Sequence, residues 1–235
     1  MKAGIFTVIL GSMNLEQTLD YAVRLGAQAV ELGAGAYAGT NHCDVDALLA
    51  SDRKAKALLQ AITCRGLEIS ALNCAGNPIH PNKKRAAADD AAFRKALRLA
   101  AKLGVQVVIN FSGCPGGAPG DKQPNWVTCP WPADYLEILE YQWNKVVIPY
   151  WSKTTEFAKS KGINKIALEM HPGFVVYNPE TLLKLRKTAG PMIGANFDPS
   201  HLFWQGIDPC AAARRSGDTQ ASEDCVTPVR VLRPW

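Results

Sequence analysis

The chain has 235 residues, of which 47% are hydrophobic and 20% charged, and this fits one large α/β domain or two small ones. Its net charge of +5 is scattered, and the two tight basic clusters, Lys83-Lys84-Arg85 and Arg214-Arg215, indicate solvated surface rather than a nucleic-acid partner. No apolar stretch approaches the roughly 18–20 residues that cross a bilayer. Seven cysteines without a Cys-x-x-Cys spacing indicate a reducing compartment, so we expect a cytoplasmic protein with no membrane partner.

Strand-like apolar runs alternate with helix-like segments along the chain. Strands are expected at 3–9, 28–33, 67–74, 105–112, 164–170 and 193–198. Helices are expected at 15–26, 46–65, 87–103, 133–161 and 179–188. Asn14 with Gln17, and Asn178 with Pro179, are start signals, and Pro149 should kink or split the helix that contains it.

Six strand–helix alternations predict a parallel sheet with right-handed crossovers. The longest loops, 34–45, 75–86 and 113–132, all follow the carboxyl ends of strands, which is the face where a (β/α)₈ barrel carries its chemistry. A doubly wound sheet would alternate in the same way. The absence of Gly-x-Gly-x-x-Gly after the first strand argues against a dinucleotide-binding sheet.

The pattern changes near residue 212. Residues 206–209 predict one more capped helix, but 214–224 is polar and aperiodic, and 226–235 holds one weak apolar run. We therefore expect a barrel domain over 1–212 and an irregular tail over 213–235. Two further βα units do not fit in that tail, so we expect about six units.

Two segments combine a carboxyl group with an imidazole at the end of an expected strand. Glu169 and His171 are two residues apart, so on a strand their side chains point the same way. Asn196 and Asp198 have the same spacing, and His201 follows just past the strand end. Neighbouring strands that end in this way can aim oxygen and nitrogen ligands into one pocket, as a divalent metal requires.

These residues resemble those of the xylose isomerase-like TIM barrels, a family that includes sugar-phosphate isomerases and epimerases, ketose 3-epimerases and the endonuclease-IV-like fold. The resemblance covers roughly residues 1–212. The segments that carry it are Ala29–Gly33, Asn77–Pro81, Leu168–His171 and Asp198–His201, of which the last two are the more specific.

The resemblance implies a metal-binding and acid/base role for Glu169, a metal-binding role for Asp198 and substrate contact for His201. The cofactor implied is a divalent metal, Mn²⁺, Mg²⁺ or Co²⁺, with Zn²⁺ as a further option. The family also places a histidine ligand on strand seven and a glutamate, the second acid/base, on strand eight. This sequence has no counterpart of either: its four histidines are residues 42, 80, 171 and 201, and the only glutamate of the tail, Glu223, lies in a segment unlike a strand. The resemblance therefore implies an incomplete TIM barrel, a truncated or frame-shifted version of a longer one.

Four further residues are candidates for substrate binding. His80 lies in the loop after the third strand, and His171 either orients Glu169 or only begins a turn. Glu31 ends the second strand, where it faces the mouth or pairs with an arginine. Asn110 ends the fourth strand, where it contacts substrate or forms a turn.

The function implied is that of a metal-dependent isomerase or epimerase in carbohydrate metabolism. Its partner would be a small-molecule sugar or sugar phosphate, with proton transfer next to a carbonyl through an enediolate. Two alternatives stay open. One is an inactive or binding-only partial barrel that lacks two metal ligands, whose open edge could pair with a second copy as a homo-oligomer. The other is an apurinic-site nuclease, disfavoured because four histidines are few for a multi-zinc site.

Overall fold

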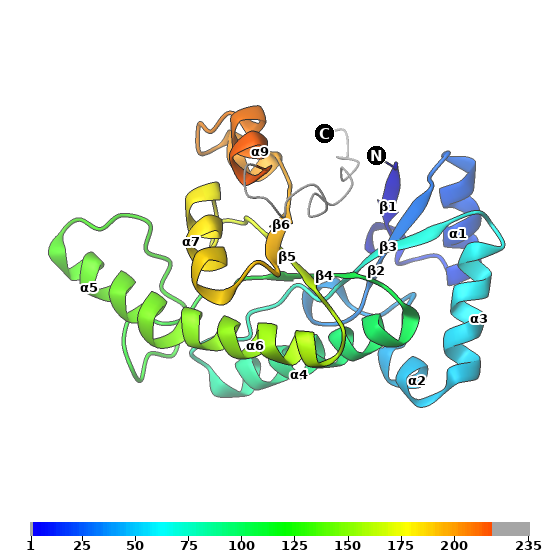
Figure 1. Ribbon diagram of the computed structural model, residues 1–235, viewed down its shortest axis with the longest axis horizontal. Helices are drawn as coiled ribbons and strands as arrows, with labels where there is room; N and C mark the ends of the chain where they lie inside the picture. Colours follow the sequence, from blue (N-terminus) through cyan, green and yellow to red (C-terminus); the bar gives the residue numbers. More distant parts are fainter. Residues whose placement is uncertain (1, 218–235) are drawn as a thin grey trace.

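A computed structural model describes residues 2–217 of the chain. Its sheet has six strands, β1 (Gly4–Phe6), β2 (Ala29–Gly33), β3 (Glu68–Asn73), β4 (Val107–Phe111), β5 (Lys165–Glu169) and β6 (Ile193–Asn196). All neighbouring strands are parallel and follow one another in chain order. The sheet curls so that β1 and β6 form its two ends (Figure 1). A doubly wound sheet would reverse its strand order at a switch point, so the sequential order excludes that alternative.

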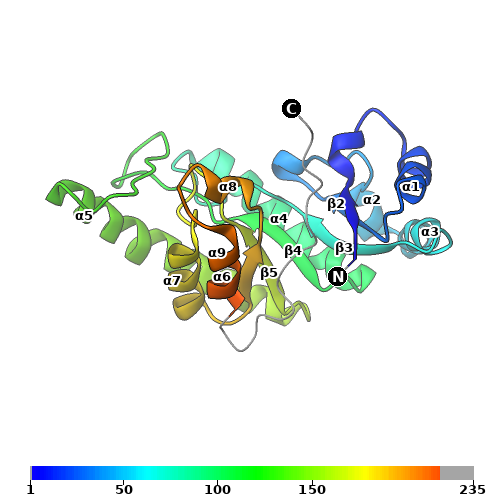
Figure 2. The same ribbon diagram turned by 90° about the horizontal axis from the view of Figure 1, so that it is seen from above.

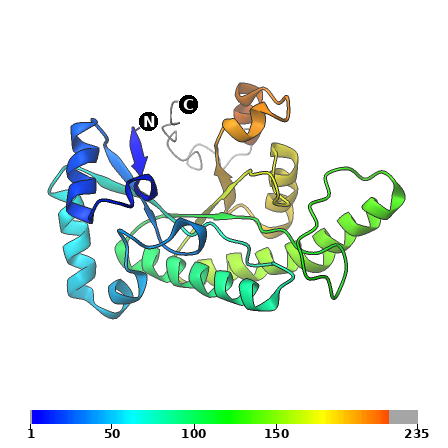
Figure 3. The ribbon, with the colours of Figure 1, turned by 180° about the vertical axis from the view of Figure 1, so that it is seen from behind.

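The helices lie on the outer side of the curled sheet (Figures 1 and 3). They are α1 (Leu15–Arg24), α2 (Val45–Ala50), α3 (Asp52–Thr63), α4 (Lys83–Leu103), α5 (Ala133–Tyr141), α6 (Ile148–Ser160), α7 (Pro179–Ala189), α8 (Ser200–Phe203) and α9 (Pro209–Gly217). Two 3₁₀ turns, η1 (Thr7–Leu10) and η2 (Ala36–Ala38), and a π-helical segment, η3 (Gln142–Val147), complete the described chain. None of the helices within residues 2–217 is both long and apolar enough to span a membrane.

The six expected strands and the start signals are confirmed. Asn14 accepts a hydrogen bond from the Gln17 backbone and forms a full capping box at α1. Asn178 does the same at α7, with Pro179 as the first helical residue. Pro149 splits the long aromatic segment as expected: it lies in the first turn of α6, directly after the π-helical η3. Proline lacks the N–H that would continue the helical ladder, which explains the irregular turn before it.

Two helix boundaries differ from the sequence-based prediction. The helix expected at 46–65 is two helices, because Ser51 adopts an extended conformation and its hydroxyl caps the Lys54 backbone at the start of α3. α4 begins at Lys83 rather than at residue 87, because the Asn82 side chain accepts hydrogen bonds from the Lys84 and Arg85 backbones. In both places a single local capping residue overrides the apolar periodicity.

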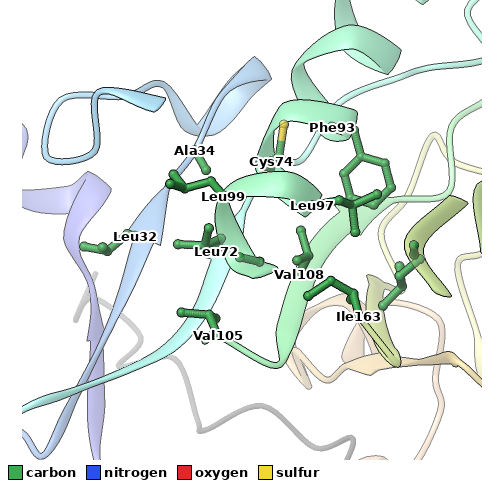
Figure 4. Close-up of a cluster of buried hydrophobic side chains, with 14 of the residues drawn as sticks. Leu32, Ala34, Leu72, Cys74, Phe93, Leu97, Leu99, Val105, Val108 and Ile163 are labelled. Carbon is green, nitrogen blue, oxygen red and sulfur yellow. The ribbon is translucent and has the colours of Figure 1, made fainter. Parts of the chain in front are cut away.

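The main core lies between the sheet and the outer helices. Its close-up in Figure 4 shows Leu32, Leu72 and Val108 from adjacent strands packed against Leu97 and Phe93 of α4. A smaller cluster, Ala71, Ile109 and Ala167, lies on the opposite, inner side of β3, β4 and β5. Alternate strand residues therefore point to the helices or into the barrel, and this alternation decides which polar side chains reach the site.

The barrel is incomplete among the described residues, since no strand follows β6 within residues 2–217. Beyond β6, α9 runs to Gly217 and crosses the boundary expected at residue 212. Residues 213–217 of the expected irregular tail are thus helical. The rest of that tail lies outside the described residues, and the division into domain and tail stays a prediction.

Candidate functional site

The candidate site forms where β5 and β6 end side by side. Glu169 is the last residue of β5 and pairs in register with Asn196, the last residue of β6. This pairing brings Asn196 Nδ2 to 2.9 Å from Glu169 Oε2, to which it donates a hydrogen bond. Asp198 follows two residues later, and His201 lies in the short helix α8 that begins at Ser200. Strand register and the α8 turn therefore bring together groups that are about 30 residues apart in sequence.

Each carboxyl group has one oxygen held by an N–H donor and the other directed towards His201. The Ser200 backbone donates to Asp198 Oδ1 at 2.9 Å, as Asn196 donates to Glu169 Oε2. The remaining oxygens, Glu169 Oε1 and Asp198 Oδ2, lie 3.1 and 3.7 Å from His201 Nε2. Glu169 is 1% exposed and Asp198 6%. Two buried carboxyl groups this close together are costly unless a positive charge compensates them.

The donor set fits a divalent metal. One ligand atom each from Glu169, Asp198 and His201 lies within 4.8 Å of the other two. Ligands bonded at about 2.0–2.2 Å lie up to about 4.4 Å from one another across a metal, so only a small adjustment is needed. Two carboxylate oxygens and one imidazole suit Mn²⁺, Mg²⁺, Co²⁺ or Zn²⁺. Within residues 2–217 no fourth histidine, cysteine or acidic residue belongs to this group.

His171 belongs to the same site, where it lies next to His201. Its ring lies 4.2 Å from the His201 ring, centroid to centroid. Its Nδ1 is 2.7 Å from the Pro172 carbonyl oxygen, and because a carbonyl only accepts, Nδ1 carries the proton of this bond. The structure thus places His171 beside His201, and the contact expected at the start of the turn is present as well.

An aromatic wall borders the site, and the sequence analysis missed it. Phe111, at the end of β4, stacks on Phe174 with ring centroids 4.3 Å apart, and it lies 4.9 Å from the His171 ring. Tyr37 extends the wall from the loop after β2, at 6.3 Å from Phe111. One sequence signal could have found Phe111: it follows Ile109 by two residues and so shares the inner side of β4, in register with Glu169.

Glu31 is buried on β2 and lies outside the carboxylate–imidazole group. Its Oε1 accepts a hydrogen bond of 2.7 Å from Asn73 Nδ2. It lies on the edge of the sheet that also carries Glu169. Its role in substrate binding stays a prediction. This position also makes Glu31 a matched buried carboxyl group for experiments on the metal centre.

Asn110 lies beside the loop that follows β3. It shares the outer side of β4 with Val108, opposite the inner Ile109, and pairs in register with Leu168 of the outer core. Its Oδ1 accepts hydrogen bonds from the backbones of Gly76 and Phe111 at 2.9 and 2.8 Å. Asn110 therefore fixes the loop after β3. These bonds agree with the turn-forming alternative, and its contact with substrate stays a prediction.

His80 also serves the loop after β3. Its Nδ1 accepts a hydrogen bond of 2.9 Å from the backbone of Asn82, the residue that caps α4. In the same segment, Asn77 bonds the Cys114 backbone through both its amide oxygen and its amide nitrogen. Burial lowers the pKa of His80, and Arg85 lowers it further, so the ring stays neutral and can accept this bond.

We predict that His80→Gln makes the stability of the protein less sensitive to mild acid. The pKa of His80 is lower in the folded protein than in the unfolded chain, so its contribution is present above about pH 6.5 and is lost as the pH falls through the folded pKa. Urea unfolding at several pH values checks this. The wild type should lose more stability than the variant below about pH 6.5, and equal losses would contradict the prediction.

The fold and the site together define a class: an α/β barrel protein with a carboxylate–imidazole centre at the carboxyl ends of its strands. The model of the family described as "Xylose isomerase-like TIM barrel" matches residues 15–223. The chain belongs to this family, and the sequence-based resemblance is confirmed.

Known relatives agree with this assignment. The "Uncharacterized protein YfiH" of Bacillus subtilis (strain 168) is 44% identical over 219 residues, which make up 92% of this chain and 70% of that protein. The crystal structure of a D-tagatose 3-epimerase-like protein superposes with a TM-score of 0.66 at 21% identity, covering 97% of this chain and 75% of the other. D-psicose 3-epimerase from Clostridium cellulolyticum H10, solved with D-tagatose, gives 0.61 at 14% identity, with 92% and 70% covered. At these identities the structural matches show the fold.

Proposed function

We propose that this protein binds a divalent metal through Glu169 and Asp198 and acts as an isomerase or epimerase on a small sugar or sugar phosphate. The observation that carries the proposal is the convergence of the buried Glu169 Oε1 and Asp198 Oδ2 on His201 Nε2. The structural neighbours include D-psicose 3-epimerase and a D-tagatose 3-epimerase-like protein, which supports the substrate class.

In the proposed reaction Glu169 transfers a proton at the carbon next to the substrate carbonyl. Asn196 holds Glu169 Oε2, so Oε1 is the oxygen that moves the proton. His201 Nε2, next to both carboxyl groups, binds a substrate hydroxyl or carbonyl oxygen. A bound divalent cation would supply polarisation of the carbonyl and stabilise the enediolate charge. The aromatic wall of Phe111 and Phe174 lies beside His171 and offers the substrate an apolar surface.

Metal binding by the purified chain tests the first half of the proposal. We expect calorimetric titration with Mn²⁺ to give one site per chain, and Asp198→Asn to weaken it about 100-fold or more, since a charged ligand is lost. Glu31→Gln is the control, because it removes a buried carboxyl group on the same sheet edge outside the centre. No binding by the wild type, or equal weakening by both variants, would refute the proposed site.

A binding-only protein is the second candidate. It is favoured by one observation: the centre has three members within residues 2–217, whereas the family resemblance implies two further metal ligands on strands seven and eight. Incubation of ketohexoses and their phosphates with the metal-loaded chain in D₂O separates the two. Deuterium at the carbon next to the carbonyl supports proton transfer, and sugar binding without deuterium uptake supports the binding-only protein.

A further inference from the structure

Helix α5 leaves apolar side chains exposed. It projects beyond the helices that flank the sheet (Figures 1 and 2) and makes its substantial contacts with η3, its own continuation. No residue of α5 is buried. Tyr135 and Leu136 are 46% and 45% exposed, and Trp131, just before the helix, is 77% exposed. An exposed apolar patch of this kind marks a contact surface.

A groove runs next to α5. It has a volume of about 720 Å³ and is bounded by α5 and η3 on one side, α7 on the other and residues 127–130 at one end. Its walls include Leu136, Leu139 and Trp143. On α7, Lys184 lies over the Trp143 ring, 4.3 Å from the centroid, and forms no ion pair within 4.0 Å in the part of the chain that the structure describes.

The charges of the helix and the groove are complementary. α5 carries Asp134, Glu137 and Glu140 and no basic residue. On the α7 wall of the groove, Lys184 and Lys187 lie towards the C-terminal end of the helix and Glu180 lies in its first turn, while Glu140 of α5 lines the opposite wall. One surface thus offers both an acidic, apolar helix and a groove with a basic end and apolar walls. A two-fold dimer needs a self-complementary surface of this kind, because each copy must supply both halves.

We propose that α5 and the groove beside α7 form a dimer interface between two copies of this chain. Each copy lays α5 in the groove of the other, so that the acidic side of the helix meets Lys184 and Lys187. Tyr135 and Leu136 of one copy then pack against the apolar walls of the other copy's groove. Aromatic and leucine side chains of this size are typical anchors of an interface core. The interface lies outside the carboxylate–imidazole centre, so the dimer proposal does not depend on the proposed function.

Sedimentation velocity over a concentration series tests the dimer. We expect the wild type to dimerise, and Leu136→Asp to raise the dissociation constant at least about 30-fold, the effect of losing a central apolar contact. Leu25→Asp is the matched control: Leu25 is a 60% exposed leucine at the end of α1, within a separate apolar surface next to β1. Circular dichroism should show both variants folded, because neither leucine is buried.

A charge exchange tests the contact more closely. Lys184→Glu with Lys187→Glu should weaken the dimer about tenfold, and adding Asp134→Lys and Glu137→Lys to the same chain should restore it. A wild type that stays monomeric up to about 100 µM overturns the proposal. A dimer that persists in Leu136→Asp also overturns it, as does a dimer that Leu25→Asp dissociates to the same extent. A charge exchange that does not restore the dimer has the same consequence.

Discussion

Replacing Glu169 by glutamine should abolish proton exchange between solvent and substrate. The change keeps the shape of the side chain but removes both its negative charge and its ability to accept a proton. We expect deuterium uptake by the sugar to fall at least about 1,000-fold, within the range in which a general base and a charged ligand contribute to catalysis. Metal affinity should fall as well, because the amide is a weaker ligand than the carboxylate.

Glu169→Asp separates the two roles of this residue. A shorter carboxylate can still bind the metal, and we expect its affinity to stay within about tenfold of the wild type. Its oxygen is displaced by about the length of one bond, and a displacement of about 1 Å can cost about 100-fold in rate. Retained exchange in Glu169→Gln would remove Glu169 from the catalytic role. Retained exchange in the glutamine variant together with intact metal binding would refute the proposed centre as a whole.

Replacing Trp151 by alanine should destabilise the protein by about 3–5 kcal/mol, a large part of the stability of an ordinary domain. Trp151 is fully buried on α6 and packs edge-on against Phe93 of α4, with ring centroids 6.0 Å apart. Its Nε1 donates a hydrogen bond of 2.9 Å to the Ser112 carbonyl oxygen, just past the end of β4. The alanine variant therefore loses apolar burial, leaves a cavity and removes a buried hydrogen bond.

Trp151→Phe is the control for this prediction. It keeps most of the buried area and loses the N–H donor, so we expect a cost of about 1–3 kcal/mol from the unpartnered carbonyl. Urea unfolding followed by circular dichroism measures both variants. Because the Ser112 hydroxyl accepts a hydrogen bond from the Val176 backbone, the loop after β5 should also lose protection from hydrogen exchange. A loss below about 1 kcal/mol in Trp151→Ala would show that α6 does not depend on this contact.

The strands and most helix starts could be predicted from the sequence, whereas some helix boundaries could not. Each of the six expected strands overlaps an observed one, and the capping residues Asn14 and Asn178 begin the helices that they were expected to begin. These features depend on side-chain periodicity and on hydrogen bonds between residues three or four apart, which the sequence contains directly. The misplaced boundaries, at Ser51 and Asn82, were also local, but the stronger periodicity of the flanking residues concealed them.

The site could be predicted in part. The strand-end spacing of Glu169 and Asp198, with His201 close behind, was sufficient to expect these three groups in one pocket, since parallel strands place their carboxyl ends on one edge. The spacing could not show that Asn196 fixes one oxygen of Glu169, which follows from the register between β5 and β6. Nor did it reveal the wall formed by Phe111, at the end of β4, and Phe174, in the loop after β5.

The sequence by itself determined the alternation of strands and helices, the family and the three residues at the centre of the candidate site. Only the tertiary structure decided that Asn110 points towards the helices, that His80 supports the cap of α4 and that α5 stands beside an open groove. The physical reason is that periodicity and capping act within a few residues. The direction of a strand side chain and the covering of a helix depend on the register of neighbouring strands and on packing between distant segments.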